Sequence, residues 1–238
     1  MICFLTSSHV IPGTSALNPA NRLVETLRAY FPQSCRGVYV CADPDNAQQT
    51  DFYSGLVKQN FEDAGFHFED YTVLDGRNAA LAPALVQKSN FLILSGGHVP
   101  TQNRFFQRVN LRGLLQEFDG VIFGISAGSM NSAEWVYAQP EEQGEAIDPA
   151  YQRFLPGLGL TKTNLLPHYQ QVKDTVLDGL RLFQDITCAD SRGRTFYAIP
   201  DGSYLFSAAG REELRGDAYR IQDGKMERIA AENDTLLL

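Results

Sequence analysis

The stretch Val121-Ile122-Phe123-Gly124-Ile125-Ser126-Ala127-Gly128-Ser129 decides the fold. An apolar, strand-like run ends in a Gly-x-Ser-x-Gly motif, and small residues that suit a helix follow it. This order of strand, sharp turn and helix is the context of a nucleophile elbow. The two glycines permit a cramped backbone, so we expect the Ser126 hydroxyl to stand above the edge of a sheet. The alternative is a tight turn in which Ser126 only caps the next helix.

Strand-like and helix-like segments alternate before the elbow and through it. Such alternation indicates βαβ units and a mostly parallel sheet with helices on both faces. The expected strands are Ile2–Thr6, Gly37–Cys41, His67–Val73, Phe91–Leu94 and Gly120–Ile125. The expected helices are Ala20–Tyr30, Thr50–Ala64, Ala79–Gln87 and Gln102–Phe118.

Ligands bind at the carboxyl ends of the strands in sheets of this kind. The strand ends Thr6-Ser7-Ser8-His9 and Ser95-Gly96-Gly97-His98 are therefore expected to lie close to Ser126.

The chain changes character after the elbow. Glu134–Asp148 is rich in Glu, Gln and Pro, which predicts a long loop, interpreted as a flap over the site. The segments that follow are an expected strand at Gly159–Leu166, a helix at Val172–Ile186, strands at Thr195–Ile199 and Ser203–Ala208, and a hairpin around Asp223-Gly224 within Ala218–Leu238. No linker or repeat divides the chain, so we expect a single domain over residues 1–238.

Composition limits the partners. The 238 residues include 20 Lys and Arg against 28 Asp and Glu, a net charge of −8. This balance disfavours nucleic acid and anionic membranes, which require basic surfaces. The four cysteines form no Cys-x-x-Cys pair, and no signal peptide or membrane span is evident. We expect a cytoplasmic protein, and a homodimer is compatible with the sequence.

An activated serine needs a base, an orienting acid and donors for an oxyanion. We choose His168 as the base because it follows the strand-like run Thr163–Leu166. His98, at another strand end, is the alternative base or a residue of the substrate pocket. The Gly96-Gly97 pair allows the Gly97 N–H to point into the site, where it would form an oxyanion hole with the Ala127 N–H.

The orienting acid is expected at Asp201, in a Pro-Asp-Gly turn between two strands. Asp190 and Asp148 are its competitors. No His-Glu-x-x-His motif is present, so we expect neither a metal nor a cofactor.

Four elements in order resemble the peptidase E (aspartyl dipeptidase) family, which is related to cyanophycinases. They are Ser95-Gly96-Gly97, Gly124–Ser129, Leu166-Pro167-His168-Tyr169 and Ile199-Pro200-Asp201-Gly202. The resemblance implies a class I glutamine-amidotransferase-like α/β fold, a Ser126 nucleophile and a His168 base. Asp201 stands where that family often has glutamate, and His98 stands where it has asparagine.

The resemblance also implies a serine exopeptidase that hydrolyses short peptides through an acyl-enzyme, with Asp-X dipeptides as a candidate substrate. The arginines that follow the histidine in that family are absent, and the nearest cations are Lys162, Lys173 and Arg181. No histidine follows His168, which argues against a standard α/β-hydrolase. Serine at the elbow argues against a glutamine amidotransferase. The alternative function is a non-catalytic protein that binds a small molecule or peptide on this fold.

Overall fold

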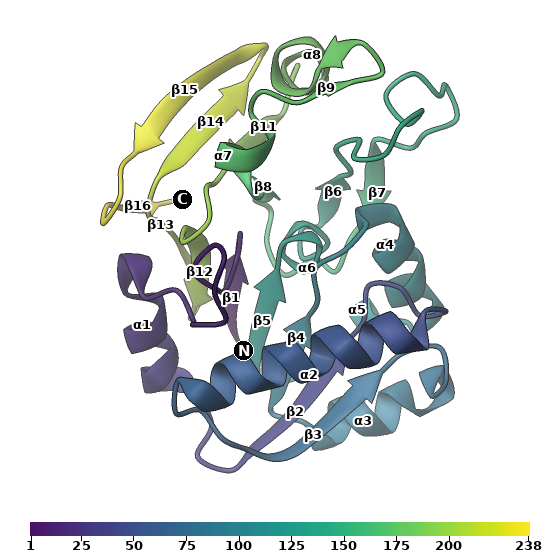
Figure 1. The fold of residues 1–238 in the computed structure, drawn as a ribbon, viewed down its shortest axis with the longest axis vertical. Helices are drawn as coiled ribbons and strands as arrows, with labels where there is room; N and C mark the ends of the chain where they lie inside the picture. The colour runs from purple at the N-terminus through teal and green to yellow at the C-terminus, as the bar shows by residue number, and fades with distance from the viewer.

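A computed structural model describes residues 1–238. Its central sheet has eight strands in the order β16-β13-β12-β1-β5-β4-β2-β3 (Figure 1). Five neighbouring strands run parallel: β1 (Ile2–Thr6), β5 (Val121–Ile125), β4 (Phe91–Leu94), β2 (Cys35–Val40) and β3 (Phe68–Leu74). Three antiparallel strands extend it on the β1 side: β12 (Tyr204–Ala208), β13 (Arg211–Arg215) and β16 (Thr235–Leu237).

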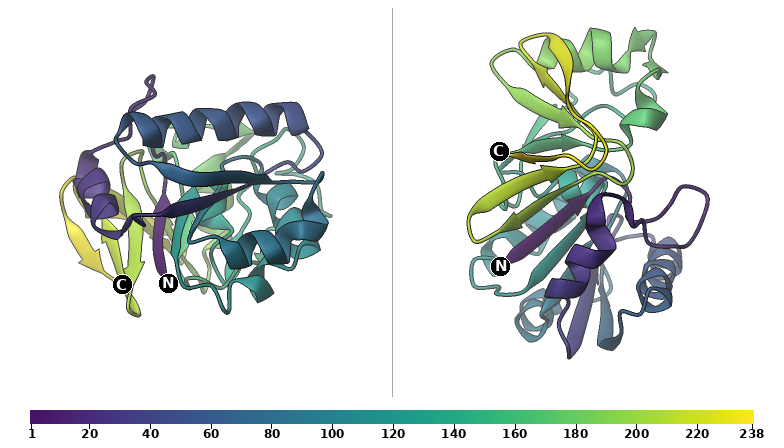
Figure 2. Two further views of the ribbon diagram at one scale, coloured as in Figure 1. Left: turned by 90° about the horizontal axis from the view of Figure 1, so that it is seen from below. Right: turned by 90° about the vertical axis from the view of Figure 1, so that its left-hand side faces the viewer.

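Helices cover both faces of the parallel strands. The long helix α2 (Ala47–Asp63) crosses one face, and α3 (Ala82–Lys88) and α5 (Leu111–Leu114) lie on the other (Figure 2, left). The remaining helices of this half are α1 (Leu23–Tyr30) and α4 (Val99–Arg108). All four residues of β4 are fully buried, as expected for a strand covered on both faces. The predicted α/β fold with a mostly parallel sheet is confirmed.

A second, four-stranded sheet stands above the carboxyl ends of the parallel strands (Figure 1). Its order is β15-β14-β11-β8, with bounds Lys225–Ala230, Ala218–Gln222, Thr195–Ala198 and Asn164–Leu166. Strands β8 and β11 pair in parallel. The predicted hairpin at Asp223-Gly224 joins β14 to β15, with φ values of 50° and 80° at the two turn residues. A short ladder of β6 (Trp135–Tyr137) and β7 (Phe154–Pro156) lies beside this sheet.

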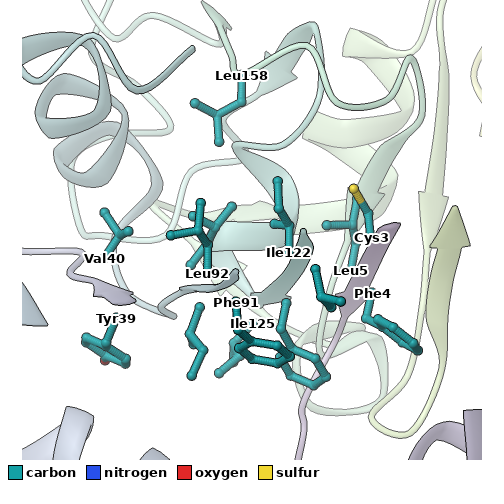
Figure 3. Packing of buried hydrophobic residues seen from close by; sticks show 14 of the residues in the cluster. Cys3, Phe4, Leu5, Tyr39, Val40, Phe91, Leu92, Ile122, Ile125 and Leu158 are labelled. Atoms are coloured by element: carbon teal, nitrogen blue, oxygen red, sulfur yellow. The ribbon is translucent and has the colours of Figure 1, made fainter. Parts of the chain in front are cut away.

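Two apolar clusters fill the interior, and each contains residues from both parts of the fold. The larger cluster fills the central sheet, with side chains such as Leu5, Val40, Leu92 and Ile122 from four adjacent strands (Figure 3). The smaller cluster lies around the second sheet, where the rings of Tyr137 and Phe196 stack with centroids 4.2 Å apart. Stacked aromatic pairs of this kind add to the free energy gained from burial.

The predicted helix over Val172–Ile186 is wrong. The structure has a short helix α7 (Tyr169–Val172), a hairpin of β9 (Val176–Leu177) and β10 (Leu180–Arg181), and a π-helical turn over Leu182–Thr187 that leads into α8 (Cys188–Asp190). Asp178 and Gly179 both have positive φ, 53° and 81°. This is the conformation of a two-residue hairpin turn, for which Asp-Gly is a preferred sequence.

Three other predicted segments are shorter or divided. The helix expected over Gln102–Phe118 is split between α4 and α5, because Asn110 adopts a left-handed conformation with φ 50°. The strand expected over Gly159–Leu166 forms only at Asn164–Leu166. The expected loop Glu134–Asp148 contains strand β6 at its start. No helix is long and apolar enough to cross a bilayer.

The elbow predicts a large effect of one methyl group on stability. A Cβ atom at Gly128 would lie 2.2 Å from the Leu94 carbonyl oxygen. Backbone cannot move aside cheaply, so Gly128→Ala should lower the free energy of unfolding by about 1–3 kcal/mol. The matched control is Gly55→Ala, in the middle of α2, where a Cβ meets nothing within 4 Å. That change should stabilise the protein by about 0.5–1 kcal/mol. Urea unfolding measures both, and equal effects would contradict the close packing.

Candidate active site

Ser126 occupies a strained turn between β5 and the single-turn helix α6 (Ala127–Met130). Its backbone has φ 49° and ψ −110°, a region that residues other than glycine rarely adopt. The turn is held at both sides, because the Ser126 N–H donates to the Thr6 carbonyl and the Gly128 N–H donates to the Ser95 carbonyl, each at 3.0 Å. Strain that is maintained by its surroundings is typical of a functional turn.

The second sheet brings His168 and Asp201 to this serine. In the parallel pair β8 and β11, Leu166 lies opposite Ala198, so both strands leave the sheet at the same edge. His168 follows the first strand by two residues and Asp201 follows the second by three. The His168 Nε2 atom lies 2.8 Å from Ser126 Oγ, and its Nδ1 atom lies 2.8 Å from Asp201 Oδ1. The site is thus assembled from both sheets.

Ser7 completes this arrangement, and sequence reasoning did not single it out. Its hydroxyl donates to Asp201 Oδ1 at 2.8 Å and accepts the His168 backbone N–H at 2.7 Å. Ser7 therefore fixes the His168 backbone, which has a left-handed φ of 60°, relative to the carboxylate. The available signal was its position at the end of β1, one of the strand ends expected to meet at Ser126.

Asp201 is nearly enclosed, with 4% of its side chain exposed. Burial would raise the pKa of this carboxyl, but the hydrogen bonds and charge of His168, together with the Ser7 hydroxyl, lower it overall. The Gln171 side chain donates to the second carboxylate oxygen at 2.7 Å. A carboxylate with several donors stays ionised and holds the imidazole in one tautomer, with Nδ1 protonated and Nε2 facing the serine.

The Gly96-Gly97 pair lies directly against the elbow. A Cβ at Gly96 would be 3.5 Å from Ser126 Cβ, and one at Gly97 would be 2.4 Å from Ala42 Cβ. Gly97 also has φ 152°. The contact at Gly97 excludes a side chain there, whereas the 3.5 Å separation at Gly96 is an ordinary van der Waals distance. The N–H groups of Gly97 and Ala127 take part in none of the hydrogen bonds of the surrounding turns and loops.

The alternative base and acids make no hydrogen bond to Ser126 or His168, although His98 lines the pocket beside Ser126. His98 Nδ1 lies 2.9 Å from Thr101 Oγ1, and its Nε2 lies 2.9 Å from Glu145 Oε1, so the ring is engaged away from Ser126. Asp190 accepts the Tyr137 hydroxyl at 2.8 Å. Asp148 accepts the Ala150 N–H at 2.8 Å. None of these bonds involves His168.

One group of side chains has spacing that a metal ion could use. The ligand atoms of His98, Glu142 and Glu145 lie within 4.8 Å of one another. The Glu145 carboxylate is already committed, because it pairs with His98 and accepts the N–H groups of Glu141 and Glu142 at 2.8 and 3.0 Å. The hydrogen bonds thus tie the Glu134–Asp148 segment to the strand end beside Ser126.

A pocket of about 750 Å³ opens next to the elbow. It lies at the carboxyl ends of β1, β2 and β4, against α2. Gly96, Gly97 and Ile125 join it to Ser126. The other lining residues that bear on recognition are His9, Tyr39, Asp43, Tyr53, His98, Arg104 and Glu142. Its volume falls in the range of small-molecule sites.

The sequence model of peptidase family S51 matches residues 4–214. The chain belongs to this family. It is therefore a peptidase hydrolase, and the resemblance to the peptidase E family is confirmed. No curated protein matches the sequence.

Two solved structures share the fold of this S51 peptidase. A peptidase from an acI-B1 Actinobacterium has a TM-score of 0.64 and 16% identity, and the match covers 100% of this chain and 96% of that one. A candidate peptidase E protein from Listeria monocytogenes EGD-e has a TM-score of 0.58 and 15% identity, with 96% and 98% covered.

The lowered pKa of Asp201 predicts a dependence of stability on pH. A depressed pKa means that the folded state favours the carboxylate, so its contribution is complete above about pH 4, the unfolded value, and is lost as the pH falls through the folded pKa. Asp201→Asn should reduce the free energy of unfolding by about 1–3 kcal/mol near neutral pH and much less at about pH 2.

Denaturant unfolding of wild type and Asp201→Asn at both pH values measures this difference. Asp148→Asn is the control, because that side chain accepts only one backbone N–H. A difference for Asp201→Asn that does not change with pH would show that the carboxylate charge is not the source of the effect.

Proposed function

We propose that this S51 peptidase is a serine exopeptidase that hydrolyses short peptides, with Ser126, His168 and Asp201 as its catalytic triad. The observation that carries the proposal is the pair of 2.8 Å contacts that link Ser126 Oγ to His168 Nε2 and His168 Nδ1 to Asp201 Oδ1. A nucleophile that contacts a base, which in turn contacts an orienting acid, is the arrangement of an activated serine.

In the proposed reaction, His168 Nε2 takes the proton of Ser126 as Oγ attacks the scissile carbonyl carbon. The carbonyl oxygen becomes an oxyanion, for which the N–H groups of Gly97 and Ala127 are the proposed donors. When the C–N bond breaks, His168 returns the proton to the leaving amine and an acyl-enzyme remains. Water, deprotonated by the same imidazole, then attacks the ester, and the acid product leaves as Ser126 regains its proton.

Asp201 acts through His168 in this scheme. It holds Nδ1 protonated and stabilises the imidazolium that forms during attack. Ser7 is a positioning residue, because it contacts both the carboxylate and the backbone of the base. The four cysteines are all unpaired, which supports our inference of a reducing, cytoplasmic setting.

The nucleophile is tested by replacing it. Wild type is expected to hydrolyse members of a dipeptide panel and to be labelled at Ser126 by a serine-reactive phosphonate, while Ser126→Ala should lose turnover by about 10³-fold or more. Liquid chromatography of the products and mass spectrometry of the labelled peptide measure both. Full turnover by Ser126→Ala would overturn the proposal, and absence of both hydrolysis and labelling would favour a non-catalytic binding protein.

The orienting acid is tested by isosteric amides. Asp201→Asn should lower kcat/KM by about 10²- to 10⁴-fold, because the amide can no longer hold the productive tautomer. Asp148→Asn and Asp190→Asn are matched controls that keep the charge change but lie outside the hydrogen bonds of His168. Equal losses in the three variants would remove Asp201 from the triad.

A further inference from the structure

The pocket beside Ser126 has an unusual charge balance for a site that would hold an acidic substrate. Two carboxylates, Asp43 and Glu142, line it, against a single permanent cation, Arg104. Glu142 belongs to no ion pair, and the Asp43 carboxylate accepts only the Asp45 N–H, at 3.2 Å. Both therefore remain free to bind a ligand cation.

The two histidines of the pocket do not reverse this balance. His9 is 8% exposed, and burial lowers its pKa to about 4, so its ring is neutral near pH 7. With the Asn60 amide nitrogen donating to the carbonyls of Ser15 and Leu56, the amide oxygen accepts the His9 Nε2–H at 3.2 Å. The His9 Nδ1 atom is then an acceptor, and it has no partner in the protein. His98 is paired with Glu145.

Arg104 is the only permanent cation in the pocket that could hold a substrate carboxylate. One nitrogen of Arg104 donates to Thr101 Oγ1 at 3.1 Å. Arg181 pairs with Asp185 at 2.6 Å, and neither Lys162 nor Lys173 lines the pocket. A carboxylate is usually held by a bidentate guanidinium or by several donors, and Arg104 is the one guanidinium that this pocket offers.

A third carboxyl lies near the catalytic histidine. Part of the Glu141 side chain is exposed, but protein around its carboxyl raises the pKa to about 7, while the nearby His98 and His168 limit that rise. Glu141 has no ion-pair partner. It is not among the residues that line the pocket, so Asp43, Glu142 and Arg104 set the charge of the pocket.

We propose that this pocket binds a positively charged side chain, lysine or arginine, of the residue beside the scissile bond, and that it disfavours aspartate there. The inference rests on the proposed function and names its substrate class. Tyr39 and Val57 offer apolar walls for the methylene groups of such a side chain, and Asp43 and Glu142 supply the opposite charge. The aromatic rings of Tyr39 and Tyr53 suit a cation as well.

Isosteric substrates isolate the effect of charge. Lys-Ala is compared with norleucine-Ala, and Arg-Ala with citrulline-Ala, with Asp-Ala as the acidic member and the reversed sequences Ala-Lys and Ala-norleucine for the other side of the bond. We expect kcat/KM for the charged member to exceed that of its neutral partner by about 10- to 100-fold at one of the two positions. Equal rates for charged and neutral partners at both positions, or a preference for Asp-Ala, would overturn the inference.

Variants of the pocket carboxylates test whether the preference for a charged side chain arises in the pocket. Asp43→Asn and Glu142→Gln should each reduce the ratio of Lys-Ala to norleucine-Ala by severalfold, and both keep an oxygen acceptor at the same place. Glu232→Gln, on an exposed residue outside the pocket, should leave the ratio unchanged. If the double variant Asp43→Asn/Glu142→Gln keeps the wild-type ratio of Lys-Ala to norleucine-Ala hydrolysis, these carboxylates do not recognise the substrate. A loss of Asp-Ala hydrolysis in Arg104→Met, if that substrate were the preferred one, would assign the pocket to an acidic side chain.

Failure of this inference differs from failure of the proposed function. If wild type hydrolyses norleucine-Ala and Lys-Ala at equal rates and Ser126→Ala hydrolyses neither, the serine peptidase proposal stands and the cationic preference is wrong. Phosphonate labelling gives a second readout, because lysinamide should protect Ser126 at lower concentration than norleucinamide. If Ser126 neither reacts with phosphonate nor supports turnover, both proposals fall.

Discussion

The close approach of the elbow to the ends of β1 and β4 is the constraint on which the rest of the site depends. Ser126 and Ser129 both bond to the Thr6 carbonyl, through a backbone N–H and a side-chain hydroxyl at 2.8 Å respectively, and Gly128 bonds to Ser95. Because every acceptor is a backbone carbonyl, the position of Ser126 follows from the position of the strands. The glycines are required by this packing, since side chains at Gly124 and Gly128 would collide with Ser129 and Leu94.

Electrostatics separates two regions that lie side by side. The Asp201 carboxylate is surrounded by donors and serves one imidazole. The carboxylates of the adjoining pocket have few donors and face open space. Carboxylates therefore occur in two environments a short distance apart, one surrounded by hydrogen-bond donors and one open to a ligand. The number of donors around each carboxylate distinguishes them.

Sequence reasoning reached the parallel sheet and the grouping of strand ends because both follow from local patterns: apolar runs, alternation and the glycines at 124 and 128. It did not reach the second sheet, since β8 has three residues and its pairing with β11 joins segments about thirty positions apart. The hairpin at Asp178-Gly179 was missed for a different reason. Its strands have two residues each, too few to show a period of two against the helical spacing of the surrounding apolar residues. Ser7 was missed because a serine at a strand end acquires meaning only from what packs against it.

The division of the site between two sheets has a consequence for how the enzyme responds to disturbance. Ser126 follows a strand of the central sheet, whereas His168 and Asp201 follow strands of the smaller one. The two apolar clusters join these parts, because Leu165 belongs to the larger cluster and Ala127 to the smaller one. Sliding of one sheet over the other would therefore disturb both clusters as well as lengthen the contact between Ser126 Oγ and His168 Nε2. The shared clusters thus keep the two sheets in register, so the Ser126–His168 contact depends on the packing within both of them.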